Sequence, residues 1–192
     1  MKQNRALRAH ERILDAAAHE FVRHGYAHTT TQAVAERSGM TKGGLYAHFT
    51  SKSELAQAFH DHASILWNDL ERTAASAGPD AHAQLSVLPG ALAEQLQRDQ
   101  RLQAALRLDD ERELSGSPGL LVQIRSRLSA LAGAAQADRA LADDCTPDLV
   151  AHILLALTLS TSRLPGSDAE VERQMEQMWA WLWSALRGGD EA

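Results

Sequence analysis

The sequence predicts an all-α fold, and three observations of composition and spacing support this prediction. Apolar residues make up 44% of the 192-residue chain, and most of them are Ala and Leu, which lose little freedom on entering a helix. Only five Pro residues occur, so few segments are barred from helical geometry. Several segments repeat apolar residues at i, i+3, i+4 and i+7, the spacing of one helix face.

The first expected helix covers about residues 8–24. Leu14, Ala17 and Phe21 fall on one face of this segment, which predicts an amphipathic helix that buries that face. Gly25 follows directly, at the position where glycine commonly ends a helix.

Two short helices are expected next, separated by a tight turn. Thr30 is a suitable N-cap for a helix that continues to about residue 37, and Gly39 is placed to stop it. Thr41 can cap a third helix over about residues 42–48. This order matches the helix-turn-helix plan, in which one helix crosses the DNA backbone and the next enters the major groove.

A capping box, Ser51 to Glu54, opens a long fourth helix over residues 52–77. Turn residues then divide the rest of the chain into helices, for a total of about nine. Pro89-Gly90 is expected to kink or split the first of these. The expected later helices cover about 81–98, 102–114, 118–142, 147–163 and 168–187.

Charge divides the chain into a basic head and an acidic body. Residues 1–60 hold eight Lys or Arg against five Asp or Glu, whereas residues 61–192 hold eleven against twenty, within a net charge of −6. This split is expected if only the head meets phosphates. We therefore predict a DNA-binding domain over residues 1–51 and a helical effector-binding and dimerisation domain over residues 52–192.

Other classes of protein find less support in the sequence. The single Cys145 excludes an internal disulfide, and no segment approaches a membrane span, so we expect a cytoplasmic protein without cofactor or metal. The pairs His24/His28 and His60/His62 leave a metal site as the alternative, although no HExxH pair or Cys partner supports it. The sequence contains no phosphate-binding glycine loop and no nucleophile motif, so we do not expect an enzyme.

The third expected helix has the composition of a helix that enters a DNA groove. Two adjacent glycines, Gly43 and Gly44, cost roughly 1 kcal/mol each relative to Ala inside a helix, so a compensating reason such as close approach to DNA is needed. Lys42, Tyr46 and His48 occupy the face opposite the apolar one. The alternative is an ordinary solvated surface.

Residues 29–55, TTTQAVAERSGMTKGGLYAHFTSKSEL, resemble the DNA-binding signature of the TetR family of regulators. The resemblance covers about residues 10–56, and Met40 and Gly44 depart from the commoner pattern. It implies an all-α protein with an N-terminal helix-turn-helix and a C-terminal helical domain. The DNA-binding residues that it implies are Thr30, Thr31, Thr41, Lys42, Gly43, Tyr46, His48 and Lys52.

The physical properties of several of these residues agree with the implied roles. Lys52 lies at a helix N-terminus, where its charge and the helix dipole both favour a phosphate. Tyr46 and His48 can bond phosphate or base edges. Arg5 and Arg8 are candidates for a further contact from an N-terminal arm.

The resemblance also implies a homodimer formed through the last two helices, about 147–163 and 168–187. An apolar stripe in the first of these suits that role, namely Leu149, Ile153, Ala156, Leu157 and Ser160. Met and Trp residues crowd the second helix, and we interpret them as core and dimer packing, with a ligand-facing Trp as the alternative.

We predict the effector-binding residues from the family resemblance and from one short segment. Residues 104–111 resemble an RLxxE stretch of γ-butyrolactone receptors, which implies a small lactone-like effector; the alternative is a surface pair of Arg107 and Glu111. The predicted ligand-binding residues are Trp67, Arg107, Gln123, Arg127 and Thr161.

Together these features predict a repressor that binds a palindromic operator as a homodimer and is released by a small-molecule effector. The alternative is a ligand-independent regulator or an activator with the same fold.

Overall fold

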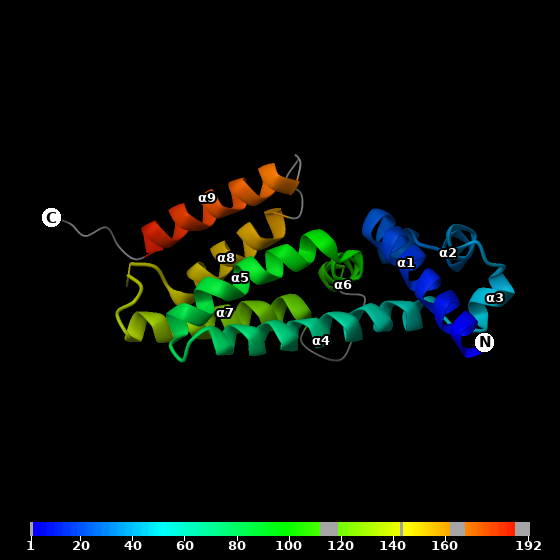
Figure 1. The fold of residues 1–192 in the computed structure, drawn as a ribbon, viewed down its shortest axis with the longest axis horizontal. Coiled ribbons are helices and arrows are strands. Elements are labelled where there is room, and N and C mark those ends of the chain that lie inside the picture. The colour runs from blue at the N-terminus through cyan, green and yellow to red at the C-terminus, as the bar shows by residue number, and fades with distance from the viewer. Residues whose placement is uncertain (1, 112–118, 143, 162–167, 187–192) are drawn as a thin grey trace. The chain divides into compact units, whose positions relative to one another are not determined.

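The structure is a computed structural model that describes residues 2–111, 119–142, 144–161 and 168–186. Within these ranges the regular elements are nine α-helices, and no strand occurs among them (Figure 1). The prediction of an all-α fold with about nine helices is confirmed.

Helix α1 covers Lys2–His28 and begins earlier than expected. It is interrupted at Gly25, whose φ of 70° and ψ of −180° lie outside helical geometry. Glycine adopts a positive φ without a Cβ clash, so the regular part of α1 ends where the sequence predicted. One further turn then leads to Thr29.

Helices α2 (Thr31–Ser38) and α3 (Lys42–Tyr46) follow with the expected caps. Gly39 ends α2 in the left-handed conformation, with a φ of 67°. Helix α3 is shorter than predicted, because Ala47 already serves as its C-cap.

Helix α4 covers Lys52–Ala77, as predicted. The amide of Glu54 donates to Ser51 Oγ at 3.1 Å, which is one half of the expected capping box. The other half differs, because Glu54 Oε2 accepts from the Thr50 amide at 2.5 Å and from the Thr50 hydroxyl at 2.8 Å. These two bonds, the hydroxyl first, lower the pKa of Glu54.

Helix α5 covers Ala81–Arg98 and continues through Pro89, so of the two expected outcomes the split is wrong, and a kink at Pro89-Gly90 stays a prediction. A proline inside a helix removes one hydrogen bond and clashes with the preceding turn. A continuous buried face on both sides of Pro89 offsets this penalty, because tertiary packing supplies most of the stability of a helix in a protein. Its leucines are Leu85, Leu88, Leu92 and Leu96.

Helices α6 (Gln100–Asp110) and α7 (Leu120–Ala137) differ from prediction mainly at their ends. Asp99 caps α6 by accepting from two backbone amides, so α6 begins before the expected residue 102. The predicted end of α6 at residue 114 lies outside the described residues. Helix α7 stops short of residue 142 because Arg139, with a φ of 57°, leaves helical geometry.

Helix α8 covers Pro147–Thr161 and α9 covers Asp168–Leu186. The predicted ends at residues 163 and 187 lie outside the described residues. No helix among the residues that the structure describes is long and apolar enough to cross a membrane.

The chain forms two compact units. Unit 1 comprises residues 1–66 and 98–121, and unit 2 comprises residues 67–97 and 122–192. Helices α1, α2, α3 and α6 and the first half of α4 belong to unit 1. The division into domains at residue 51 stays a prediction.

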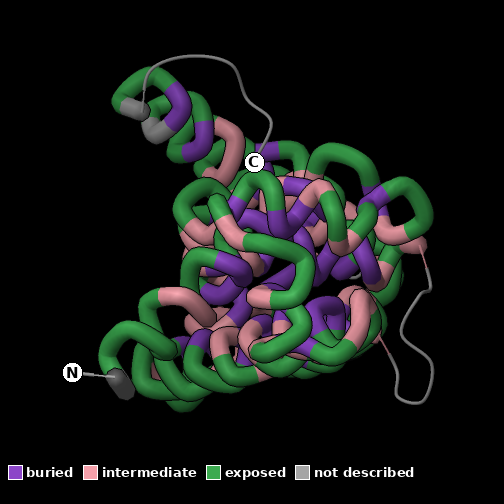
Figure 2. The backbone as a smooth tube through the Cα atoms, turned by 90° about the vertical axis from the view of Figure 1, so that its right-hand side faces the viewer, coloured by how far each residue is buried: buried purple, intermediate pink, exposed green. Residues whose placement is uncertain are grey.

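Each unit has an apolar core, and buried and exposed residues alternate along its helices (Figure 2). In unit 1, Phe21 and Phe59 are fully buried and meet edge to face, with ring centroids 5.7 Å apart. Truncating such a ring to Ala costs about 3–5 kcal/mol. In unit 2, Ala93 packs with Val171 and Met175, with Trp179 against them.

Candidate nucleic-acid interface

Two threonines cap the helices of the helix-turn-helix. The amide of Ala33 donates to Thr30 Oγ1 and the amide of Gly44 donates to Thr41 Oγ1, each at 3.1 Å. Both threonines are exposed. Since each oxygen accepts in its cap, the hydroxyl hydrogen stays available to donate outward. Hydroxyls in this position can donate to a phosphate oxygen.

The turn between α2 and α3 is held from two directions. Within the turn, the amide of Met40 donates to the Ala35 carbonyl at 2.9 Å and the amide of Gly39 donates to the Glu36 carbonyl at 3.1 Å. From α1, the Arg12 guanidinium donates to the carbonyl of Ser38. These bonds give the orphan carbonyls at the end of α2 their partners.

Tyr46 joins the two helices on their exposed side. Its hydroxyl lies 3.3 Å from Thr31 Oγ1, and the Lys42 ammonium lies 5.9 Å from the centre of its ring. Tyr46 is 42% exposed. The structure therefore brings Thr31, Lys42 and Tyr46 together on one solvent-facing surface that carries a cation and two hydroxyls.

The two glycines of α3 have different surroundings. A Cβ on Gly44 would lie 3.2 Å from Thr41 Oγ1, so Gly44 leaves room for the cap of its own helix. A Cβ on Gly43 would meet nothing within 4 Å. Nothing inside the described chain therefore requires glycine at Gly43, and close approach of an outside partner stays the candidate reason.

His48 lies half-buried just after α3, next to a residue that sequence reasoning missed. The ring of His10, on α1, stacks on Phe49 with centroids 4.6 Å apart and lies 6.2 Å from the ring of His48. His10 shares the i, i+4, i+7 face of Leu14 and Ala17, and that spacing could have identified it as an inward-facing residue.

Lys52 is held closely by the end of α1. Its ammonium donates to the carbonyl of Tyr26 at 2.7 Å and to the carbonyl of Thr29 at 3.0 Å, and it lies 4.2 Å from the centre of the Tyr26 ring. An ammonium has three donors, so one is left for a phosphate. The structure thus adds to Lys52 a positioning role that its place at a helix start did not predict.

The predicted effector residues do not all lie in one unit. Arg107 belongs to unit 1, where its guanidinium pairs with Glu111 at 2.9 Å, whereas the other four belong to unit 2. Trp67 is 4% exposed. Arg127 donates to Gln84 at 3.0 Å and lies 3.2 Å from Glu71.

The last two predicted effector residues have different surroundings. The Thr161 hydroxyl donates to the Thr158 carbonyl at 2.7 Å, and the side chain of Gln123 is exposed.

A solvent-open hollow of about 310 Å³ lies in unit 1 between α1, α2 and the start of α6. None of the five predicted effector residues lines it. Its lining residues are Arg12, Asp15, Ala16, His19, Arg37, Ser38 and Gln100.

One histidine of each pair in the metal alternative has a protein partner. His62 Nε2 lies 2.5 Å from Asp99 Oδ2, and His24 lies 3.8 Å from Glu20. Among the described residues no group of three or more His, Cys, Asp or Glu could hold a metal ion. The hydrogen bond between His62 and Asp99 links α4 to the N-cap of α6.

Comparisons with known proteins match the chain over different lengths. The family model for bacterial regulatory proteins of the tetR family matches residues 13–59. The A-factor receptor protein of Streptomyces griseus is 43% identical over 60 residues, which are 31% of this chain and 22% of that relative. The chain thus spans less than a quarter of the length of this curated relative.

Solved structures match over nearly the whole chain. A crystal structure of a γ-butyrolactone receptor is 27% identical with a TM-score of 0.78 and covers 93% of this chain and 87% of that chain. The TetR family protein CprB of Streptomyces coelicolor, solved with its biological operator sequence, is 27% identical with a TM-score of 0.77. That match covers 93% of this chain and 88% of the other.

Proposed function

Because residues 13–59 match the tetR family of bacterial regulatory proteins and nearly the whole chain is similar in structure to a γ-butyrolactone receptor, we propose that the chain is a TetR-family DNA-binding repressor that binds a near-palindromic operator as a homodimer and is released by a small molecule. The observation that carries the DNA-binding part is the exposed surface of Thr31, Lys42 and Tyr46, flanked by two capping threonines. Its relatives are regulators and not enzymes.

In this proposal α3 lies in the major groove and α2 crosses the DNA backbone. The hydroxyls of Thr30 and Thr41 donate hydrogen bonds to phosphates, and the ammonium of Lys42 pairs with a phosphate of the DNA backbone. Gly43 lets α3 approach the groove floor closely, since no side chain stands out there. Tyr46 and His48 contribute contacts at the groove, and Lys52 holds a phosphate with its remaining donor.

The dimer part is supported by the exposure pattern of α8. Its inner face is buried at Val150 and Leu154, whereas the predicted stripe faces outward or is half-buried. Leu149 is 47% exposed, and on α9 Trp181 is 73% exposed. Large exposed apolar side chains on adjacent elements are typical of an interface. Two copies would present their α3 helices about 34–36 Å apart, one turn of DNA.

The effector part is supported by the relatives, two of which are receptors by name: the A-factor receptor protein and a γ-butyrolactone receptor. We therefore propose a small lactone-like effector, with Trp67 in unit 2 as the primary contact. Trp67 is nearly fully buried, so an effector would reach it only through rearranged packing. Such a ligand must favour the non-binding state, by about 1–3 kcal/mol of coupling.

The alternative with the same fold is a ligand-independent regulator. Titration of the protein–DNA complex with a synthetic γ-butyrolactone separates the two: release supports the effector, and unchanged DNA binding at saturating lactone supports the alternative.

The test of DNA binding is selection of duplexes from a random pool by the full chain, followed by affinity measurements on the selected sequence. We expect Tyr46→Phe and His48→Ala to change preference among related duplexes, and Lys42→Met to weaken binding to all of them. If none of the three alters binding, the assignment of α3 as the recognition helix is wrong.

A further inference from the structure

The last turn of α6 contacts the last turn of α1 through one carboxylate. The backbone amide of Tyr26 donates to Glu111 Oε2 at 2.7 Å, although the two residues are 85 positions apart. The side chain of Glu111 is about a quarter exposed and is also paired with Arg107 at 2.9 Å. The contact lies within unit 1, at the end of α1 that leads into α2.

The backbone at this contact is built for close approach. Gly25 has a φ of 70°, and a Cβ added there would lie 2.8 Å from Glu111 Oε2. The glycine is therefore needed both for the conformation and for the space that the carboxylate occupies. A helix end normally leaves amides and carbonyls without partners, and here Glu111 supplies the partner of an amide just beyond the break.

The peptide that Glu111 holds is also held from α4. The Tyr26 carbonyl accepts from Lys52, and the same ammonium reaches the Thr29 carbonyl. Thr29 is buried and its hydroxyl donates to the Gly25 carbonyl at 2.7 Å. The next residue, Thr30, is the cap of α2. The set of hydrogen bonds thus runs from Glu111 to the first turn of α2.

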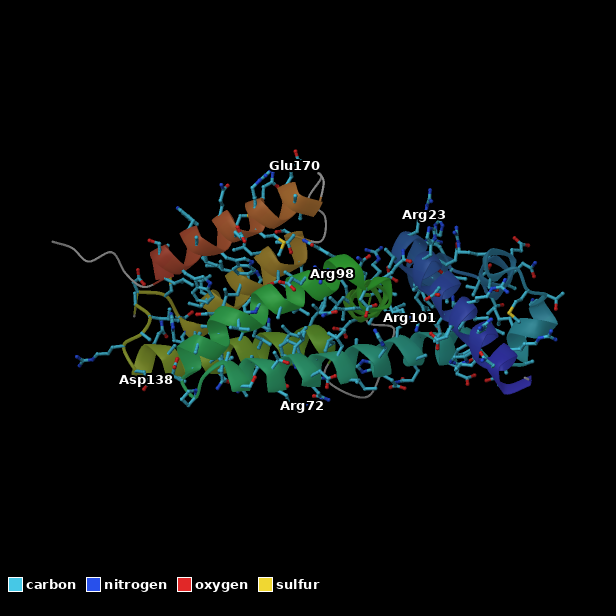
Figure 3. The ribbon with its side chains drawn as sticks, viewed as in Figure 1. Arg23, Arg72, Arg98, Arg101, Asp138 and Glu170 are labelled. Carbon is cyan, nitrogen blue, oxygen red and sulfur yellow. The ribbon has the colours of Figure 1, made fainter. Side chains whose placement is uncertain are left out.

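The start of α6 is anchored too, so its last turn has a defined position. Arg101 lies there (Figure 3) and donates to Glu11 at 2.7 Å and to Asp15 at 2.6 Å. In the last turn, Asp109 Oδ2 accepts from the amide of Leu121, in the first turn of α7, at 2.8 Å. One turn of α6 therefore holds the end of α1 and the beginning of α7.

We propose that Glu111 is a positioning residue for DNA binding: by holding the Tyr26 amide it sets the exit of α1, and with it the placement of α2 and α3. This inference rests on the proposed function, because the property that Glu111 controls is operator affinity. It assigns Glu111 a role apart from an effector contact and apart from a surface pair with Arg107. Without this hydrogen bond the end of α1 would have to become ordered when DNA binds, and the entropic cost of that ordering lowers the affinity for DNA.

The experiment compares the full-length wild type with Glu111→Ala and Glu111→Gln, on a duplex that the wild type selects from a random pool. Glu94→Ala, which removes an exposed carboxylate in unit 2, is the matched control. Dissociation constants are measured by fluorescence anisotropy at a temperature where melting curves show every variant folded. Amide hydrogen exchange at Tyr26 reports the contact itself.

We expect Glu111→Ala to raise the dissociation constant by roughly five- to thirtyfold, in the range of couplings measured through contact networks, and to speed exchange at Tyr26. Glu111→Gln keeps an oxygen that accepts from the amide, so its affinity should stay within about twofold of wild type, as should that of Glu94→Ala. A residue that only stabilises the fold would lower the melting temperature and leave the affinity of folded protein unchanged.

The outcomes separate this inference from the proposed function. If the wild type selects no duplex, both fail. If the wild type binds and Glu111→Ala binds equally or more tightly, or if Glu111→Gln is as impaired as Glu111→Ala, this inference alone is overturned.

Discussion

Replacing Lys52 with Met tests the positioning role that the structure adds to this residue. The substitution keeps the aliphatic stem and removes the ammonium that donates to the Tyr26 and Thr29 carbonyls. A hydrogen bond from a charged group contributes about 1.5–3 kcal/mol, and a cation–π contact at a partly exposed site adds about 0.5–1 kcal/mol. Because Lys52 is half-buried, water can bond the two carbonyls in the variant, and this offsets part of the lost free energy. We expect the free energy of unfolding to fall by about 2–3 kcal/mol.

Urea titrations followed by circular dichroism measure this loss. Lys42→Met is the matched control, because Lys42 is exposed on α3, where its ammonium lies over the ring of Tyr46; the stability of this variant should stay within about 0.5 kcal/mol of wild type. In salt titrations of DNA binding, each variant should lower the slope by about one unit for its one lost phosphate contact.

Two results would refute this reasoning about Lys52. A Lys52→Met variant as stable as wild type would mean that the two carbonyl bonds contribute nothing to folding. A salt slope that is unchanged in Lys52→Met but lowered in Lys42→Met would mean that the third donor of Lys52 meets no phosphate, so that its role is positioning alone.

Three further predictions concern other parts of the fold. Gly39→Ala forces a Cβ into the left-handed conformation and to 2.9 Å from Arg12 Nη2, so thermal melting should show a loss of about 1–2 kcal/mol; an unchanged melting temperature would contradict the role of Gly39 as a C-cap. Burial raises the pKa of Asp99, but hydrogen bonds from His62 and from two backbone amides outweigh it and lower the pKa overall. The stability from Asp99 is therefore present above its unfolded pKa and is lost as pH falls through the lower folded value, and Asp99→Asn should flatten urea-measured stability across that acid range; an equally steep acid loss would show that other groups cause it. Leu149→Glu should shift the protein from dimer to monomer in analytical ultracentrifugation, because it places a charge on the exposed stripe of α8, and a variant that sediments as a dimer would place the interface elsewhere.

Sequence reasoning worked best where structure depends on neighbouring residues. The caps at Thr30 and Thr41 and the stop at Gly39 were predicted correctly, because each needs only a side chain or a φ angle within about four positions. The same holds for α4, whose bounds agree with prediction at both ends. The extra turns of α1 and the early stop of α7 were not predicted, since terminal turns depend on weak local signals.

Local reasoning failed where packing competes with it. Pro89 is a helix breaker by its own chemistry, yet α5 continues through it because a buried leucine face on both sides favours one helix. Glu54 was expected to bond the cap residue, and it bonds Thr50 instead, which is a local contact at an exposed site and owes nothing to packing.

The sequence by itself determined the class of the fold and the helix-turn-helix, because these follow from periodicity, capping and spacing within short segments. Only the tertiary structure decided that Thr31 of α2 meets Tyr46 of α3 on one exposed surface, and what holds that surface in place. The bonds of Lys52 to the end of α1 and of Glu111 to the Tyr26 amide join residues 23 to 85 positions apart. Such partners are chosen by the packing of whole helices, and no local pattern in the sequence records them.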